Sequence, residues 1–220
     1  MKIARCLTAE FIGTALLLSA IVGSGIMGER LSGGNNAIAL LANSLATGGM
    51  LIAIIIIFSD ISGAHFNPAV TIMSAVQGRI KWVDTTPYII VQLMGAFVGV
   101  AAAHLMFSEP VFSISQNIRS GNSQLFSEFI ATFGLIAVIW GCTRSRPSAT
   151  PFAIAAYIVS AYWFTASTSF ANPAVTLARM VSNTFSGIRP EDVFGFIIAQ
   201  LLGLLVAIFV FRWLMPLKNI

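Results

Sequence analysis

Two copies of the tripeptide Asn-Pro-Ala are the residues of this sequence best suited to a chemical role. They stand at Asn67-Pro68-Ala69 and Asn172-Pro173-Ala174, and Val-Thr follows each copy. Asn is a favoured N-cap and Pro a favoured first helical residue, so each copy predicts a helix start. The capping side chain accepts a backbone N–H through its oxygen and keeps its N–H groups for a ligand. The predicted chemistry is therefore hydrogen-bond donation without a catalytic step.

The electrostatics of two such helix starts point to a shared site. Each helix N-terminus carries roughly half a positive charge. Two ends that meet at the middle of a membrane would donate hydrogen bonds and repel cations. A single Asn-Pro-Ala is more often an ordinary helix start, but two copies 105 residues apart in a repeated sequence favour the shared site.

The composition of the rest of the chain is that of a membrane protein. Of its 220 residues, 57% are hydrophobic and 9% are charged, whereas about 25% are charged in soluble domains. This excludes a soluble globular domain, a disordered chain and a nucleic-acid-binding protein. The two cysteines, Cys6 and Cys142, form no CxxC motif. We therefore predict no disulfide framework, no metal site and no cofactor.

Charge-poor stretches predict six membrane spans in an all-α fold. A spanning helix needs about 20 mostly apolar residues. The predicted spans are 8–27, 37–58, 85–107, 126–143, 150–167 and 192–214. Two other apolar stretches, Ser62–Gly78 and Ser167–Thr184, contain the Asn-Pro pairs. We expect these to be re-entrant half-helices, whose irregular ends are tolerated where they are buried in protein or line a cavity.

The two halves of the sequence repeat each other. The spacing of Asp84, Gln92 and Gly95 recurs in Asp192, Gln200 and Gly203, and the segment that starts at Glu10 parallels the one at Glu128. Three spans in each half make the second half inverted, and inverted repeats place a substrate path at their interface. We predict one channel domain over 1–220, divided into repeat one at 1–107, a connecting loop at 108–125 and repeat two at 126–220.

The basic residues predict the orientation in the lipid bilayer. With both termini cytoplasmic, eight Lys or Arg residues lie inside and four outside, which agrees with the positive-inside rule. The inner set is Lys2, Arg5, Arg79, Lys81, Arg144, Arg146, Arg212 and Lys218, and the outer set is Arg30, Arg119, Arg179 and Arg189.

These motifs make the chain resemble an aquaporin of the major intrinsic protein family over essentially its whole length. The resemblance rests on the segment Ser62–Thr71, on Asn172-Pro173-Ala174, and on Glu10 and Glu128. It implies six helices with two half-helices, one pore per subunit, a homotetramer in the plasma (inner) membrane, and passive flow of small uncharged molecules. No enzymatic activity is expected.

The resemblance also implies roles for three residues near the half-helices. Glu10 and Glu128 are the only carboxylates inside the long apolar spans. The matching family acids brace the half-helix loops, a structural role that we favour here. His65 resembles a loop histidine of the family, and either lines the pore or bonds the loop.

The expected selectivity filter departs from the family pattern. The family usually has Arg three residues after the second Asn, where this chain has Val175. Spacing from the two motifs places the other filter positions at Thr47, Ser160 and Ser169. All four side chains are small and uncharged, which predicts an unusually wide filter for glycerol-like solutes, urea, water and uncharged metalloid hydroxides. The presence of Thr47 and Val175 at the filter positions makes the chain resemble a bacterial aquaporin branch associated with arsenic resistance.

Three alternatives remain open from the sequence. Arg179, one turn after Val175, either reaches back to line the pore or is a cation favoured by the half-helix C-terminus, and we favour the second. The pore could instead be water-selective. A coupled secondary transporter also uses inverted repeats, but it would normally carry more ionisable residues within its spans than one Glu per half.

Overall fold

The computed structural model describes residues 3–216, and every regular element within them is helical. The prediction of an all-α fold is thereby confirmed. The long helices are α1 (Ile3–Leu31), α2 (Asn36–Ser62), α4 (Trp82–Met106), α5 (Asn122–Ser145), α6 (Thr150–Phe164) and α8 (Pro190–Leu214). The short ones are α3 (Pro68–Val76) and α7 (Pro173–Arg179), and a 3-10 turn at Pro147–Ala149 precedes α6. Lys2 and Lys218 of the orientation argument lie outside the described residues.

The six predicted spans each coincide with a long helix. Within the described residues, five of these helices are long and apolar enough to cross a membrane. The sixth, α6, has 15 residues, because the chain leaves the helix at Thr165 rather than at residue 167. The other five helices begin before their predicted spans, and three of them, α1, α2 and α5, also end later; α1, for example, begins at Ile3 and ends at Leu31. Hydropathy marks the apolar part of a helix, and the helix can continue beyond it through more polar residues.

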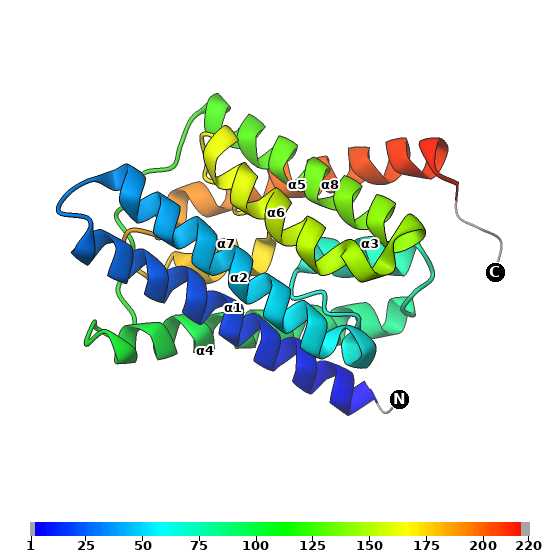
Figure 1. Cartoon of the computed structure of the whole chain (residues 1–220), viewed down its shortest axis with the longest axis horizontal. Helices are drawn as coiled ribbons and strands as arrows, with labels where there is room; N and C mark the ends of the chain where they lie inside the picture. Colours follow the sequence, from blue (N-terminus) through cyan, green and yellow to red (C-terminus); the bar gives the residue numbers. More distant parts are fainter. Residues whose placement is uncertain (1–2, 217–220) are drawn as a thin grey trace.

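The half-helices lie inside the bundle of long helices. In Figure 1, α3 runs from the middle of the molecule toward the end where α1 begins and α8 ends, and α7 runs toward the opposite end. Their N-termini therefore meet near the centre. We call the end reached by α3 the terminal face and the end reached by α7 the connecting-loop face.

Equivalent glycines allow the close packing of equivalent helices in the two halves. α4 packs on α1, and α8 packs on α5. A Cβ added to Gly95 would lie 2.4 Å from the carbonyl oxygen of Phe11, and one added to Gly203 would lie 2.4 Å from that of Phe129. Small residues at helix contacts are typical of membrane bundles, where backbones approach closely. The recurring glycines of the sequence are therefore packing positions.

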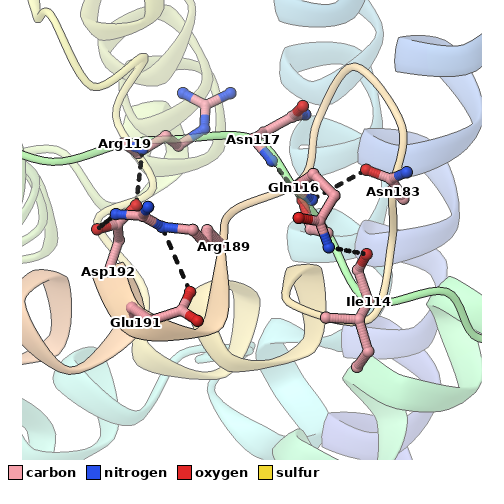
Figure 2. Close-up of polar contacts among 9 residues, drawn as sticks. Ile114, Gln116, Asn117, Arg119, Asn183, Arg189, Glu191 and Asp192 are labelled. Carbon is pink, nitrogen blue, oxygen red and sulfur yellow. Dashed lines mark hydrogen bonds and ion pairs between the residues drawn. The ribbon is translucent and has the colours of Figure 1, made fainter.

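The connecting loop covers the face reached by α7. It spans residues 107–121, so α5 begins at Asn122, earlier than the predicted 126. Its backbone pairs with the segment 180–189 that follows α7, through Ser113 N–H to Val181 O at 3.0 Å and Ser115 N–H to Met180 O at 2.9 Å. Figure 2 shows Gln116 of the loop bonded to Asn183 of that segment. The loop thereby fixes the region just outside α7.

Candidate solute pore

One cavity of about 1220 Å³ lies between the helices of the two halves. Residues of both half-helix regions line it, including Asn67 and Asn172. Toward the terminal face its charged lining residues are Asp60, Arg79, Lys81 and Asp84. Toward the connecting-loop face its lining residues include Thr47, Tyr162, Ser169, Phe170, Val175 and Arg179.

The two Asn side chains cap their own half-helices and bind the opposite loop. The Asn67 oxygen accepts the Ala69 N–H at 2.8 Å, and its amide donates to Ala171 O at 2.8 Å. The Asn172 oxygen accepts the Ala174 N–H at 3.0 Å, and its amide donates to Phe66 O at 2.8 Å. An amide group has two N–H donors, so one on each side chain remains for a solute. The sequence predicted the caps but not the bonds between the loops.

Glu10 holds the first half-helix loop through four hydrogen bonds. One carboxylate oxygen accepts the Ser62 hydroxyl at 2.6 Å and the His65 N–H at 2.9 Å. The other accepts the Phe66 N–H at 2.7 Å and the Gln92 amide at 2.8 Å. The side chain is fully buried. A buried carboxylate needs such donors, because an unpaired charge is costly away from water. These are the contacts that a loop-bracing role requires.

Glu128 makes the equivalent contacts in the second half. Its oxygens accept the Ser167 hydroxyl at 2.6 Å, the Phe170 N–H at 2.8 Å, the Ala171 N–H at 2.9 Å and the Gln200 amide at 2.6 Å. Gln200 also donates to the Thr176 hydroxyl at 2.8 Å, as Gln92 does to Thr71 at 2.9 Å. The repeat of these Gln positions was visible in the sequence, but it indicated no function. In the structure each Gln side chain donates a hydrogen bond to the bracing acid of its own half.

The braced loops have an unusual backbone conformation. Ala64 and Phe66 have φ values of 52° and 50°, and Ser169 and Ala171 have values of 51° and 47°. Non-glycine residues in this left-handed region cost of order 1–3 kcal/mol each and persist where their surroundings hold them. The hydrogen bonds to Glu10 and Glu128 supply that support. The conformation and the bracing acid therefore belong to one arrangement in each half.

Three of the four expected filter residues line the cavity together. Thr47 and Val175 are each 2% exposed and Ser169 is 3% exposed, and all three border the cavity. The Ser169 hydroxyl has no hydrogen-bond partner among residues 3–216. Thr47 donates to Asn43 O at 2.8 Å. One unpaired hydroxyl is thus available to a solute at this level.

The prediction for Ser160 is wrong. Ser160 is exposed and bonds to Ala156 O of its own helix, and it is not among the residues that line the cavity. The buried residues Ile158 and Tyr162 of α6 line the cavity instead. Residues two positions apart in a helix point in directions about 200° apart. Ser160 is two positions from both Ile158 and Tyr162, so it faces away from both. We placed Ser160 by the family's residue spacing to the second Asn-Pro-Ala copy, and in this chain that spacing leads to the wrong face of α6.

Tyr162 takes the place that was predicted for Ser160. Its side chain is 3% exposed, and its hydroxyl lies 3.3 Å from that of Thr47. The part of the cavity where we expected the filter therefore contains an aromatic ring, contrary to the expectation of four small side chains. The helix α6 is apolar on all sides, so its sequence carried no signal that this residue faces inward.

Arg179 fits both interpretations that we considered, because it ends α7 and also belongs to the cavity wall. It is the last residue of α7, as the interpretation that we favoured requires, and its side chain is only 1% exposed and lines the cavity. Of the two interpretations left open for His65, the structure agrees with the first, and its side chain contacts the half-helix α3 rather than the loop. His65 lines the cavity, and its Nδ1 lies 3.2 Å from the Thr71 hydroxyl.

A second arginine supports this end of the cavity from the connecting loop. Arg119 donates to Gly187 O at 2.8 Å and Ser167 O at 3.1 Å. Burial lowers the pKa of its guanidinium, but an arginine side chain stays charged in proteins. Sequence analysis assigned Arg119 only to the outer side of the membrane. Nothing in its neighbouring residues indicated that it reaches the second half-helix loop.

Comparison with known proteins agrees with the fold. The family model described as Major intrinsic protein matches residues 1–166. The chain belongs to the major intrinsic protein family. It is therefore a multi-pass membrane protein of a family whose aquaglyceroporins are channels and not enzymes.

Relatives of this family cover most of the chain. Aquaglyceroporin AqpS of Rhizobium meliloti is 51% identical over 211 residues, which are 96% of this chain and 90% of that protein. A protein of Thermotoga maritima named "Probable glycerol uptake facilitator protein" is 33% identical over 63% of this chain and 64% of its own length. The X-ray structure of the aquaglyceroporin from Plasmodium falciparum has the same fold, with a TM-score of 0.76, 21% identity and 98% of each chain covered.

Proposed function

We propose that the chain is a passive channel for small uncharged solutes, among them water, glycerol-like polyols, urea and uncharged arsenic or other metalloid hydroxides. The observation that carries the proposal is the cavity bordered by both Asn67 and Asn172, whose amides tie the two half-helices together. The relatives named as an aquaglyceroporin and a glycerol uptake facilitator support solutes of glycerol size.

The polar groups of the cavity suit an uncharged solute with hydroxyl groups. At the centre, the remaining amide N–H groups of Asn67 and Asn172 donate to solute oxygens, and the helix N-termini make this point unfavourable for cations. Among residues 3–216, the carbonyl oxygens of Gly63, Ala64 and His65 accept no hydrogen bond. They are available to accept from solute hydroxyls. A solute can therefore exchange its water partners for donors and acceptors along the path, which is how pore linings select.

The assembly and the location follow from the family and from the charge pattern. We propose a homotetramer with one pore per subunit in the plasma (inner) membrane, with both termini cytoplasmic. In that orientation the connecting-loop face is outside the cell. The exposed apolar side chains on the long helices, such as Ile57, Phe209 and Trp213, would then contact lipid or neighbouring subunits.

A water-selective pore is the second candidate, and one structural observation favours it. Tyr162 and Arg179 add bulk to the end of the cavity where only small side chains were expected. The predicted width of the filter is therefore the point that solute measurements must decide.

Stopped-flow light scattering with proteoliposomes tests the proposal. We expect linear, gradient-independent flux of water, glycerol, urea and uncharged trivalent arsenic species. Rapid water flux with exclusion of all the larger solutes would support the water-selective pore. Saturable flux that depends on a proton gradient would instead identify a coupled secondary transporter and overturn the channel.

A further inference from the structure

Arg179 lies on the same side of α7 as Val175 but nearer the connecting-loop face. A step of four residues along a helix is a rotation of about 40° and a rise of about 6 Å, so Arg179 lies nearly above Val175. Both residues border the cavity. The family pattern has Arg at the position of Val175. In this chain the cation, Arg179, lies one helical turn beyond that position.

The guanidinium of Arg179 has few protein partners for a buried charge. Its Nε donates to the carbonyl oxygen of Ser186, and its central carbon lies 3.4 Å from the centroid of the Phe170 ring. The ion pairs found among residues 3–216 do not include Arg179. Arginine has five N–H donors, and no acceptor for the terminal four is found among these residues. A guanidinium that borders the cavity with N–H groups unused by the protein favours any oxygen acceptor that enters it.

Both partners of Arg179 lie on segments that Arg119 holds. Arg119 donates to Gly187 O, beside Ser186, and to Ser167 O, three residues before Phe170. Its own guanidinium carbon lies 5.0 Å from the Phe170 centroid. The Arg119 backbone N–H is fixed by Asp192 at 2.8 Å, and Figure 2 shows its guanidinium directed away from that carboxylate. Arg119 is therefore free to bond the loops and does not neutralise Asp192.

We propose that Arg179 is a specificity-determining residue of the pore, and that Arg119 is a positioning residue for it. Arg179 presents its unused N–H groups to solutes with two or more oxygen acceptors on one side, such as polyols and metalloid hydroxides. Its charge, together with that of Arg119, excludes cations at the connecting-loop face. The inference rests on the proposed channel function and adds the residue that selects among solutes by hydrogen bonding.

The test replaces Arg179 with Met, which keeps most of the length and removes the charge and the donors. Arg30 provides a matched control, because it also stacks on a phenylalanine, at 5.4 Å from the Phe107 centroid, but does not border the cavity. In proteoliposomes, Arg179→Met should raise the cation leak and change the glycerol-to-water flux ratio by about tenfold, the effect of losing one charged hydrogen bond. Arg30→Met should match the wild type in both measurements.

Arg119→Met separates positioning from simple stabilisation. If Arg119 acts through Arg179, its loss should shift the flux ratio and the cation leak in the same direction, and the double variant should show no further shift. A purely structural role would lower all fluxes together and leave the ratio unchanged. That result would overturn the positioning assignment.

The outcomes distinguish this inference from the channel proposal. A wild-type protein that carries none of the solutes overturns the proposed function itself. A conducting wild type with an Arg179→Met variant of unchanged ratio and unchanged cation leak overturns only the role of Arg179.

Discussion

The side-chain amide of Asn67 donates a hydrogen bond to the backbone carbonyl of Ala171 at 2.8 Å, joining the two halves of the chain at the centre of the cavity. Asn172 makes the reciprocal bond to Phe66 at 2.8 Å. Each Asn is thus the cap of one half-helix and a support for the opposite loop. Neither half can form this constriction alone, because each loop requires the other's amide.

Replacing Asn67 or Asn172 with Ala should lower solute flux or weaken ion exclusion even where the protein assembles. Loss of an N-cap usually costs about 0.5–2 kcal/mol, and here a bond between the loops is lost as well. Asn35 provides a control, because it caps α2 at an exposed site by accepting from Ala37 and Ile38. Asn35→Ala should lower the melting temperature only slightly and leave flux unchanged. Wild-type flux and ion leak in both Asn67→Ala and Asn172→Ala would remove the central-constriction assignment.

The bracing acids should be needed for stability as well as for flux. Glu10→Gln or Glu128→Gln places an amide N–H group against donors that now bond a carboxylate oxygen. Leaving a buried donor without its acceptor costs about 1–3 kcal/mol. We expect a clear fall in the melting temperature in detergent, measured by intrinsic fluorescence. The exposed Glu29→Gln serves as the control and should melt like the wild type; equal melting of all three variants would show that the braces are dispensable.

The sequence predicted those parts of the site that repeat between the halves. Asn67 and Asn172, and Glu10 and Glu128, recur in register, and the structure places each pair in equivalent surroundings. The matching Gln92 and Gln200 were also visible, but their role as donors to the acids could not be read from spacing. It depends on how closely α4 and α8 approach the loops.

The parts that the sequence did not predict lie where the two halves differ. The position of Tyr162 depends on where α6 ends and how the chain turns toward Asn172, which a fixed residue count does not capture. Burial of Arg179 depends on the connecting loop and on the segment that carries Ser186. The connecting loop lies between the two repeats, and the segment after α7 is longer than residues 77–81, which follow α3 in the first half, so the repeat gave no information about either.

The repeated glycines should be sensitive to a single added methyl group. In Gly95→Ala and Gly203→Ala the new Cβ would meet a backbone oxygen at 2.4 Å, so a helix must move. Overpacking of this kind typically costs about 1–3 kcal/mol. Gly141 is helical too, but an added Cβ there meets nothing within 4 Å. Gly141→Ala should therefore stabilise the protein slightly, since Ala is the better helix former. Thermal unfolding in detergent measures all three, and a Gly95→Ala variant as stable as Gly141→Ala would contradict the close packing of α1 and α4.

Introducing Arg at the position of Val175 tests the filter itself. Val175→Arg places a second long cation among Thr47, Ser169 and Tyr162, one turn before Arg179. Part of the lumen would be filled, so glycerol and urea should lose flux several-fold while water, which is smaller, loses less. Repulsion between like charges four residues apart also weakens the half-helix by a few tenths of a kcal/mol.

Val175→Leu is the matched variant, because it adds bulk without charge or donors. If size alone decides, Val175→Leu should shift the glycerol-to-water ratio in the same direction but less strongly than Val175→Arg. The ratio is the useful measurement, because absolute flux also follows the amount of protein in the vesicles. Size-exclusion chromatography must first show that each variant assembles as the wild type does. A correctly assembled Val175→Arg variant with an unchanged ratio would mean that residue 175 does not face the permeating solute, and the assignments of Thr47 and Ser169, which rest on the same spacing argument, would lose their support.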